Sequence, residues 1–81
     1  MKSINITVQS ELGFHVRPAS LFVNKTKEFK SNVKIKKGEV EVDGRKLMKI
    51  LLLEIKKGDN IELTVDGIDE DIAVEELGKL I

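Results

Sequence analysis

The chain of 81 residues contains no cysteine, tryptophan or tyrosine, and its only aromatic side chains are three phenylalanines. Without cysteine it can form no disulfide framework, no thiolate metal site and no thiol nucleophile. So few aromatic side chains argue against a stacking platform for single-stranded nucleic acid. A single histidine with no cysteine beside it cannot complete a usual metal site, so neither a metal nor another cofactor is expected.

The chain also lacks a net charge and a long apolar segment. Fourteen basic residues balance fourteen acidic ones, so no overall field would attract nucleic acid or a membrane surface. The longest apolar run, residues 50–53, is too short to span a bilayer. The alternating N-terminal segment is unlike a signal peptide. We therefore expect a cytoplasmic, monomeric protein with no direct membrane insertion.

Hydrophobic periodicity divides the chain into seven elements. Apolar and polar residues alternate, as in strands with one buried face, near residues 3–9, 33–35, 40–42 and 61–65. Helices are expected over residues 16–29, 46–54 and 69–81. The order β-α-β-β-α-β-α predicts one α+β domain, residues 1–81, with helices packed on one face of an antiparallel or mixed sheet.

The single histidine lies in the segment GFHVRPA, residues 13–19, just before the first expected helix. The first N–H groups of a helix have no partner within it, and with the helix dipole they can bind an anion such as phosphate. A neutral imidazole can attack a phosphoryl donor, and Arg17 offers a planar set of donors to phosphate oxygens. Because most surface histidines have no such role, these residues alone also allow an ordinary loop histidine. A Ser-His-Asp hydrolase is not expected, because no glycine-flanked nucleophile is present.

The second expected helix carries more apolar side chains than one buried face can hold. They cover most of its circumference and comprise Leu47, Met48 and residues 50–53. Some should be exposed and mark a docking patch, unless the helix is buried more deeply or covered in a dimer. Leu21 lies off the core stripe of the first helix and can join this patch. Basic residues on the two helices would suit an acidic partner, or form an ordinary solvated face; they are Arg17, Lys25, Lys27, Arg45, Lys46 and Lys49.

Residues 13–20 resemble the active-site signature of the HPr family, the histidine-containing phosphocarrier proteins. Residues 46–49 fall at the second signature of that family, and residues 66–70 resemble the turn before its last helix. The resemblance therefore spans essentially the whole chain. It implies an open-faced β-sandwich, in which four antiparallel strands carry three helices on one face.

The resemblance also implies a place in the phosphoenolpyruvate:sugar phosphotransferase system. Enzyme I would pass a phosphoryl group to Nδ1 of His15, and the chain would hand it to the IIA domains of sugar transporters. The chain would then be a stoichiometric carrier and not an enzyme. His15 and Arg17 would take part in transfer, and the phosphate would lie against Val16, Arg17 and Pro18. The partner-docking residues would be Ser20, Leu21, Lys27, Leu47, Met48, Lys49 and Leu51.

Some residues depart from the family pattern. Lys46 stands where many Gram-positive members carry a regulatory serine, so phosphorylation by the dedicated kinase is expected to be absent. Because lysine cannot cap the second helix as serine does, Asp43 is the candidate cap. Leu12 replaces a polar residue that often precedes Gly13, and Phe14 and Val16 are bulkier than usual.

Two other functions remain open at this point. The chain could be an HPr-like module that regulates partner enzymes by binding alone. It could also serve a nitrogen-related or dihydroxyacetone-kinase phosphorelay instead of sugar uptake. The retention of His15, Arg17 and Pro18 favours transfer over binding alone, because a binding module needs no imidazole.

Overall fold

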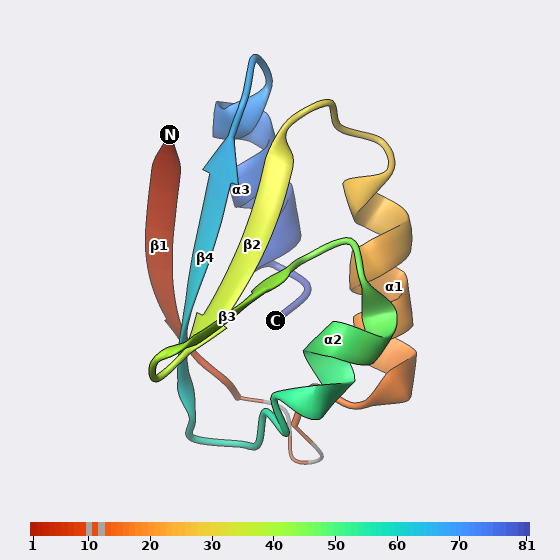
Figure 1. The fold of residues 1–81 in the computed structure, drawn as a ribbon, viewed down its shortest axis with the longest axis vertical. Helices are drawn as coiled ribbons and strands as arrows, with labels where there is room; N and C mark the ends of the chain where they lie inside the picture. The colour runs from red at the N-terminus through yellow and green to blue at the C-terminus, as the bar shows by residue number, and fades with distance from the viewer. Residues whose placement is uncertain (10, 12) are drawn as a thin grey trace.

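The computed structural model describes residues 1–9, 11 and 13–81 of the chain (Figure 1), so Leu12 lies outside the described residues. Its strands are β1 (Lys2–Thr7), β2 (Asn32–Lys37), β3 (Val40–Asp43) and β4 (Asn60–Asp66). Its helices are α1 (Val16–Thr26), α2 (Leu47–Leu52) and α3 (Glu70–Gly78). The strands form one fully antiparallel sheet in the order β1-β4-β2-β3, with the helices on one face. The predicted open-faced sandwich is confirmed.

The two faces of the sheet follow from the alternation of apolar and polar residues, since successive side chains of a strand point in opposite directions. Leu63 in the middle of β4 is opposite Ile4 of β1 and Ile35 of β2. These apolar side chains lie on the face that the helices cover. The next residue of β4, Thr64, points to the open face, where its hydroxyl is 3.3 Å from that of Ser3.

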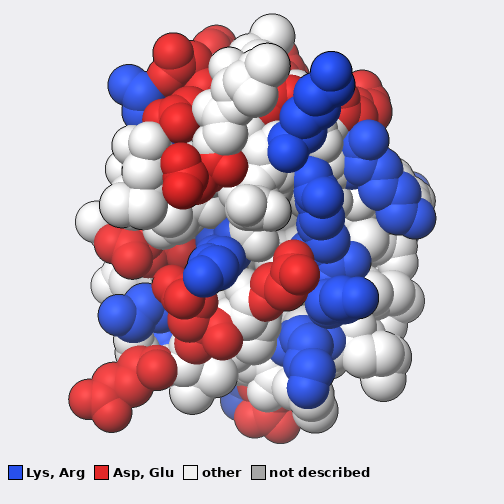
Figure 2. All heavy atoms as spheres, turned by 45° about the horizontal axis from the view of Figure 1, so that its top comes forward, with Lys and Arg blue, Asp and Glu red and all other residues white. Residues whose placement is uncertain are grey.

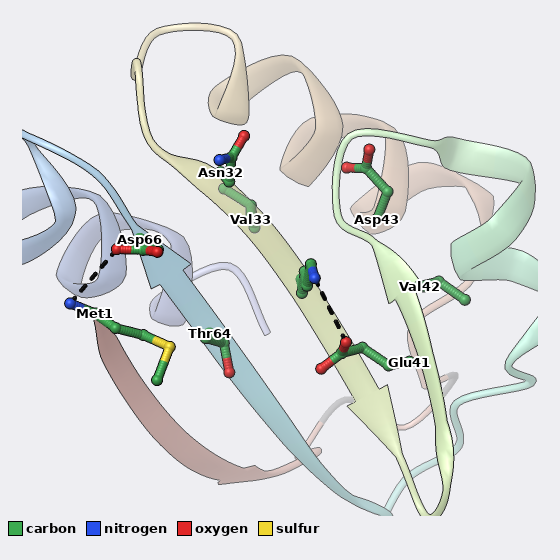
Figure 3. Close-up of a pocket in the computed structure, with 9 residues that line it drawn as sticks. Met1, Asn32, Val33, Glu41, Val42, Asp43, Thr64 and Asp66 are labelled. Atoms are coloured by element: carbon green, nitrogen blue, oxygen red, sulfur yellow. Dashed lines mark ion pairs between the residues drawn. The ribbon is translucent and has the colours of Figure 1, made fainter.

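The open face carries a shallow depression of about 340 Å³ between the N-terminus and β3 (Figure 3). Two ion pairs border it: Lys34 lies 3.7 Å from Glu41, and the amino group of Met1 lies 3.6 Å from Asp66. Exposed pairs of this kind contribute little to stability. The depression lies on the side of the sheet that faces away from the helices.

The core fills the space between the sheet and the helices. Phe22 of α1, Ile50 of α2 and Leu77 of α3 have no exposed surface. Phe14, which precedes α1, is also buried and meets Phe22 edge-on, with ring centroids 5.6 Å apart and an interplanar angle of 85°. Aromatic pairs favour this arrangement. The residue next to His15 is therefore anchored in the core.

All three helices end earlier than the sequence predicted. α1 ends at Thr26 and not near Phe29, because the N–H groups of residues 27–29 bond to carbonyls three residues back. The same tighter bonds close α2 at Leu52 and α3 at Gly78. Such bonds commonly terminate helices. No helix in the described ranges has both the length and the apolar character needed to cross a membrane.

The expectation that Asp43 caps α2 is wrong. Its carboxylate accepts a hydrogen bond from the N–H of Arg45, at 2.9 Å, and its carbonyl accepts one from the N–H of Lys46, at 3.1 Å. Both bonds belong to the turn before the helix, a common use of aspartate. The N-cap residue is Lys46, which makes no side-chain capping bond. α2 therefore begins without a side-chain cap.

Glu54, just beyond the end of α2, has a φ of +51°, a backbone conformation that residues other than glycine rarely adopt. Glycine is usual at this place after a helix. Replacing Glu54 with Gly is therefore expected to raise the free energy of unfolding by about 0.5–1 kcal/mol, measured by urea denaturation. The control is Glu54→Ala, which keeps a Cβ. An equal gain in both variants would show that the backbone conformation is not the cause.

Candidate functional site

His15 occupies the N-cap position of α1, where the sequence placed it. Its backbone is extended, with φ −92° and ψ −167°, and its carbonyl accepts the first helical hydrogen bond, from the N–H of Ala19 at 2.9 Å. The side chain is exposed and makes no capping hydrogen bond. The imidazole is therefore accessible to another protein.

The backbone that follows His15 presents free donors. The N–H groups of Val16 and Arg17 belong to the first turn of α1, where no helical carbonyl can accept them. The positive end of the helix dipole lies at the same place and favours an anion. Pro18 has no N–H to donate and is tolerated in the first turn of α1, which begins at Val16. Of the three residues after His15, only Val16 and Arg17 therefore offer a backbone N–H to phosphate oxygens.

Arg17 is exposed, and among the described residues no carboxylate lies within ion-pairing distance of its guanidinium. A guanidinium stays charged at any physiological pH and offers paired donors to phosphate. Val16, beside it, is 57% exposed and gives the site an apolar rim. Arg17 is therefore free to bind an anion held at His15.

The loop before His15 rests on the segment that follows α2. The N–H of Phe14 donates to the carbonyl of Ile55 at 3.0 Å. Gly13 has a φ of +72°, and a Cβ there would lie only 2.9 Å from the Cα of Lys56, so no larger residue fits. Nothing in the sequence pointed to Ile55, because a contact through backbone groups leaves no pattern in the side chains.

The predicted docking residues lie on α1 and α2, which pack against each other, except Lys27, which directly follows the end of α1. Leu21 and Met48 are 56% and 69% exposed. The exposed lysines of the set are Lys27 and Lys49, and its half-buried members are Ser20, Leu47 and Leu51. A groove of about 530 Å³ between the helices is lined by five of the seven, namely Ser20, Lys27, Leu47, Met48 and Lys49. Leu21 and Leu51 do not line it.

Leu52 is an exposed apolar residue that the predicted docking set did not include. It is 73% exposed, more than any other large apolar side chain of α2. It follows Met48 by four residues, so both side chains lie on the same side of the helix. That spacing was the signal in the sequence that could have identified it.

Charge is distributed unevenly over the surface. In Figure 2 most of the visible Lys and Arg side chains lie on the right, the side on which Figure 1 shows α1 and α2. Most of the visible Asp and Glu side chains lie on the left. Arg45 does not add to the basic surface as expected. Its Nη2 points inward and donates to the carbonyls of Phe29, at 2.9 Å, and Ser31, at 2.6 Å.

Comparisons with known proteins agree with this fold. A family model described as the PTS HPr component phosphorylation site matches residues 2–81. Phosphocarrier protein HPr of Borreliella burgdorferi is 42% identical over 69 residues, which cover 85% of this chain and 80% of the relative. Phosphocarrier protein HPr of Lysinibacillus sphaericus is 36% identical over 81 residues, which cover 100% of this chain and 92% of the relative.

Solved structures give the same result. HPr-C-His from Thermoanaerobacter tengcongensis superposes with a TM-score of 0.94 at 33% identity, covering 100% of this chain and 91% of that one. Fold and sequence thus define a phosphocarrier of the phosphotransferase system. The chain belongs to the HPr family.

Proposed function

We propose that this chain accepts a phosphoryl group from phosphorylated enzyme I on Nδ1 of His15 and transfers it to the IIA domains of sugar transporters. Membership of the HPr family gives the general phosphocarrier role. The observation that carries the proposal is the exposed imidazole at the N-cap of α1, next to the free amides of Val16 and Arg17. This arrangement combines a nucleophile with donors for a phosphate.

The chemistry of the acceptance step follows from these groups. The lone pair of Nδ1 attacks phosphorus, the bond between phosphorus and the donor breaks, and its electron pair leaves with the donor. Negative charge on the phosphoryl oxygens is stabilised by the amides of Val16 and Arg17 and by the Arg17 guanidinium, because preorganised donors act strongly on developing charge. Transfer to the next protein is the same step in reverse. One histidine per chain makes the carrier stoichiometric.

The test is to incubate the chain with enzyme I and phosphoenolpyruvate and to measure its intact mass. We expect one acid-labile phosphoryl group per chain, and none when enzyme I is left out. The phosphorylated chain should then lose the group when a IIA domain is added. No mass gain with an active donor would rule out acceptance, and a group retained in the presence of IIA would rule out that acceptor.

Replacing Met48 with Glu is expected to slow transfer from enzyme I by about 30-fold or more, since the loss of a central apolar contact costs about 2 kcal/mol. Met48 is 69% exposed, so the free energy of unfolding should change little. Initial rates of phosphorylation and urea denaturation measure the two quantities.

The matched control for Met48→Glu is Ile72→Glu on α3. Ile72 is likewise apolar and 56% exposed, but it lies outside the α1–α2 surface. Its replacement should leave transfer unchanged. Equal slowing in both variants would mean that docking is not centred on α2.

A further inference from the structure

Lys37, the last residue of β2, places its ammonium group beneath the end of α2. Nζ donates to the carbonyls of Leu53, at 3.0 Å, and Glu54, at 2.7 Å, and lies 2.9 Å from Oδ2 of Asp59. An ammonium has three N–H groups, and these three acceptors use all of them. The carbonyl end of a helix also favours a cation. Lys37 therefore connects the end of β2 to the end of α2.

Asp59 holds the other end of residues 53–59, the segment that follows α2. The oxygen that meets Lys37 also accepts a hydrogen bond from the N–H of Lys56 at 2.8 Å. The Lys56 N–H, and after it the Lys37 ammonium, hold the pKa of Asp59 below its ordinary range. The carbonyl of Asp59 accepts a bond from the N–H of Val8 at 2.9 Å. Residues 53–59 are thus fixed at both ends.

The middle of this segment supports the loop that carries His15. Ile55, which accepts the N–H of Phe14 at 3.0 Å, directly follows the Glu54 carbonyl that Lys37 holds. Glu54 has the unfavourable φ of +51°, a conformation that persists only where surrounding contacts impose it. Lys37 supplies two of those contacts. The position of the Ile55 carbonyl, and with it the peptide of Phe14, therefore depends on Lys37.

We propose that Lys37 is a positioning residue for phosphoryl transfer: by fixing residues 53–55 it fixes the loop that orients His15 against the amides of α1. The proposal rests on the proposed function of His15. Lys37 touches neither His15 nor a partner in this account, and it acts through the backbone of Ile55 and Phe14. Small displacements of a reacting group reduce rates strongly, so the loss of this support should reduce the rate more than the stability.

The decisive variant is Lys37→Met, which keeps the aliphatic stem and removes all three donors. The Phe14 amide should exchange its hydrogen at least about 10-fold faster relative to the Ile50 amide of α2, because local opening of a segment exposes its own amides first. The rate of phosphoryl transfer at saturating enzyme I should fall about 5-fold, while the apparent KM for enzyme I should stay within about twofold of the wild-type value. Lys37→Arg keeps the charge and donors and should recover most of both losses.

The matched control is Lys34→Met on the same strand, which removes the exposed pair with Glu41 on the open face and should change neither measurement. If Lys37→Met fails to fold, Asp59→Asn weakens the same support from its other partner and should show the same two effects to a smaller extent. Unchanged Phe14 exchange and transfer would overturn the proposal, whatever happens to the melting temperature. If wild-type protein accepts no phosphoryl group, the function of His15 is wrong, and the Phe14 exchange rate still shows whether Lys37 holds the loop.

Discussion

His15→Ala protein is expected to accept no acid-labile phosphoryl group and to pass none to a IIA domain. The chain contains one histidine, so no other imidazole can take over. The remaining site keeps its amides and guanidinium, but these groups only bind an anion, and covalent transfer needs a nucleophile. Intact mass after incubation with enzyme I and phosphoenolpyruvate measures the result. An equally acid-labile group on the variant would place the acceptor elsewhere.

The loss of function in His15→Ala should not come from unfolding. The imidazole is exposed and makes no capping bond, so the free energy of unfolding should stay within about 0.5 kcal/mol of wild type. Arg17→Ala is the informative comparison, because it keeps the nucleophile and removes a phosphate-binding cation. It should still be phosphorylated to completion, but about 10²-fold more slowly. Complete loss of phosphorylation in Arg17→Ala would contradict the expectation that Arg17 only stabilises the phosphoryl group.

The sequence predicted the elements and the place of His15 because both depend on local chemistry. Alternation along β4 reports one buried face wherever a strand packs on helices. The N-cap position of His15 follows from the change of periodicity at Val16. The ends of the helices were predicted less well, because backbone hydrogen bonds to carbonyls three residues back terminate them, and residues of any type can form such bonds. Asp43 was assigned to the cap because it lies shortly before α2, but its carboxylate bonds to Arg45 within the preceding turn.

The supports of the site could not be predicted, since they join segments far apart in the chain. Lys37 meets carbonyls of residues 16 and 17 positions away, and nothing in the pattern around a strand lysine marks such a contact. Arg45 was assigned to the surface by its charge, yet its guanidinium bonds to carbonyls of Phe29 and Ser31. A long basic side chain can turn inward where backbone carbonyls accept the hydrogen bonds of its charged group.

Asp69, just before α3, connects that helix to the start of β2. Its carboxylate accepts hydrogen bonds from the N–H of Lys30, at 2.8 Å, from the N–H of Ser31, at 3.0 Å, and from the Ser31 hydroxyl. Ser31 has no exposed surface. A buried donor that loses its acceptor costs about 1–3 kcal/mol, and Ser31 has two such donors. The contact therefore stabilises the fold at a point far from His15.

Replacing Asp69 with Ala is expected to lower the melting temperature at neutral pH by about 10 °C, the largest stability effect we predict. Thermal unfolding followed by circular dichroism measures it. The matched control is Asp71→Ala two residues further on, whose carboxylate is 81% exposed and, within the part of the chain that the structure describes, forms an ion pair only with Lys2, at 3.3 Å. That replacement should shift the melting temperature by no more than about 2 °C. Equal shifts would mean that the effect comes from the charge of the first turn and not from Ser31.

The pH dependence of the same pair of proteins tests the cause. The Ser31 hydroxyl, and after it the Lys30 N–H, hold the pKa of Asp69 below its ordinary value of 3.8. A carboxylate whose pKa is lower in the folded state contributes stability that is complete above the unfolded pKa and is lost as the pH falls through the folded pKa. The difference between wild type and Asp69→Ala should thus be constant from about pH 5 to pH 8 and shrink below about pH 4. A difference that persists undiminished to about pH 2 would show that the ionised carboxylate is not its source.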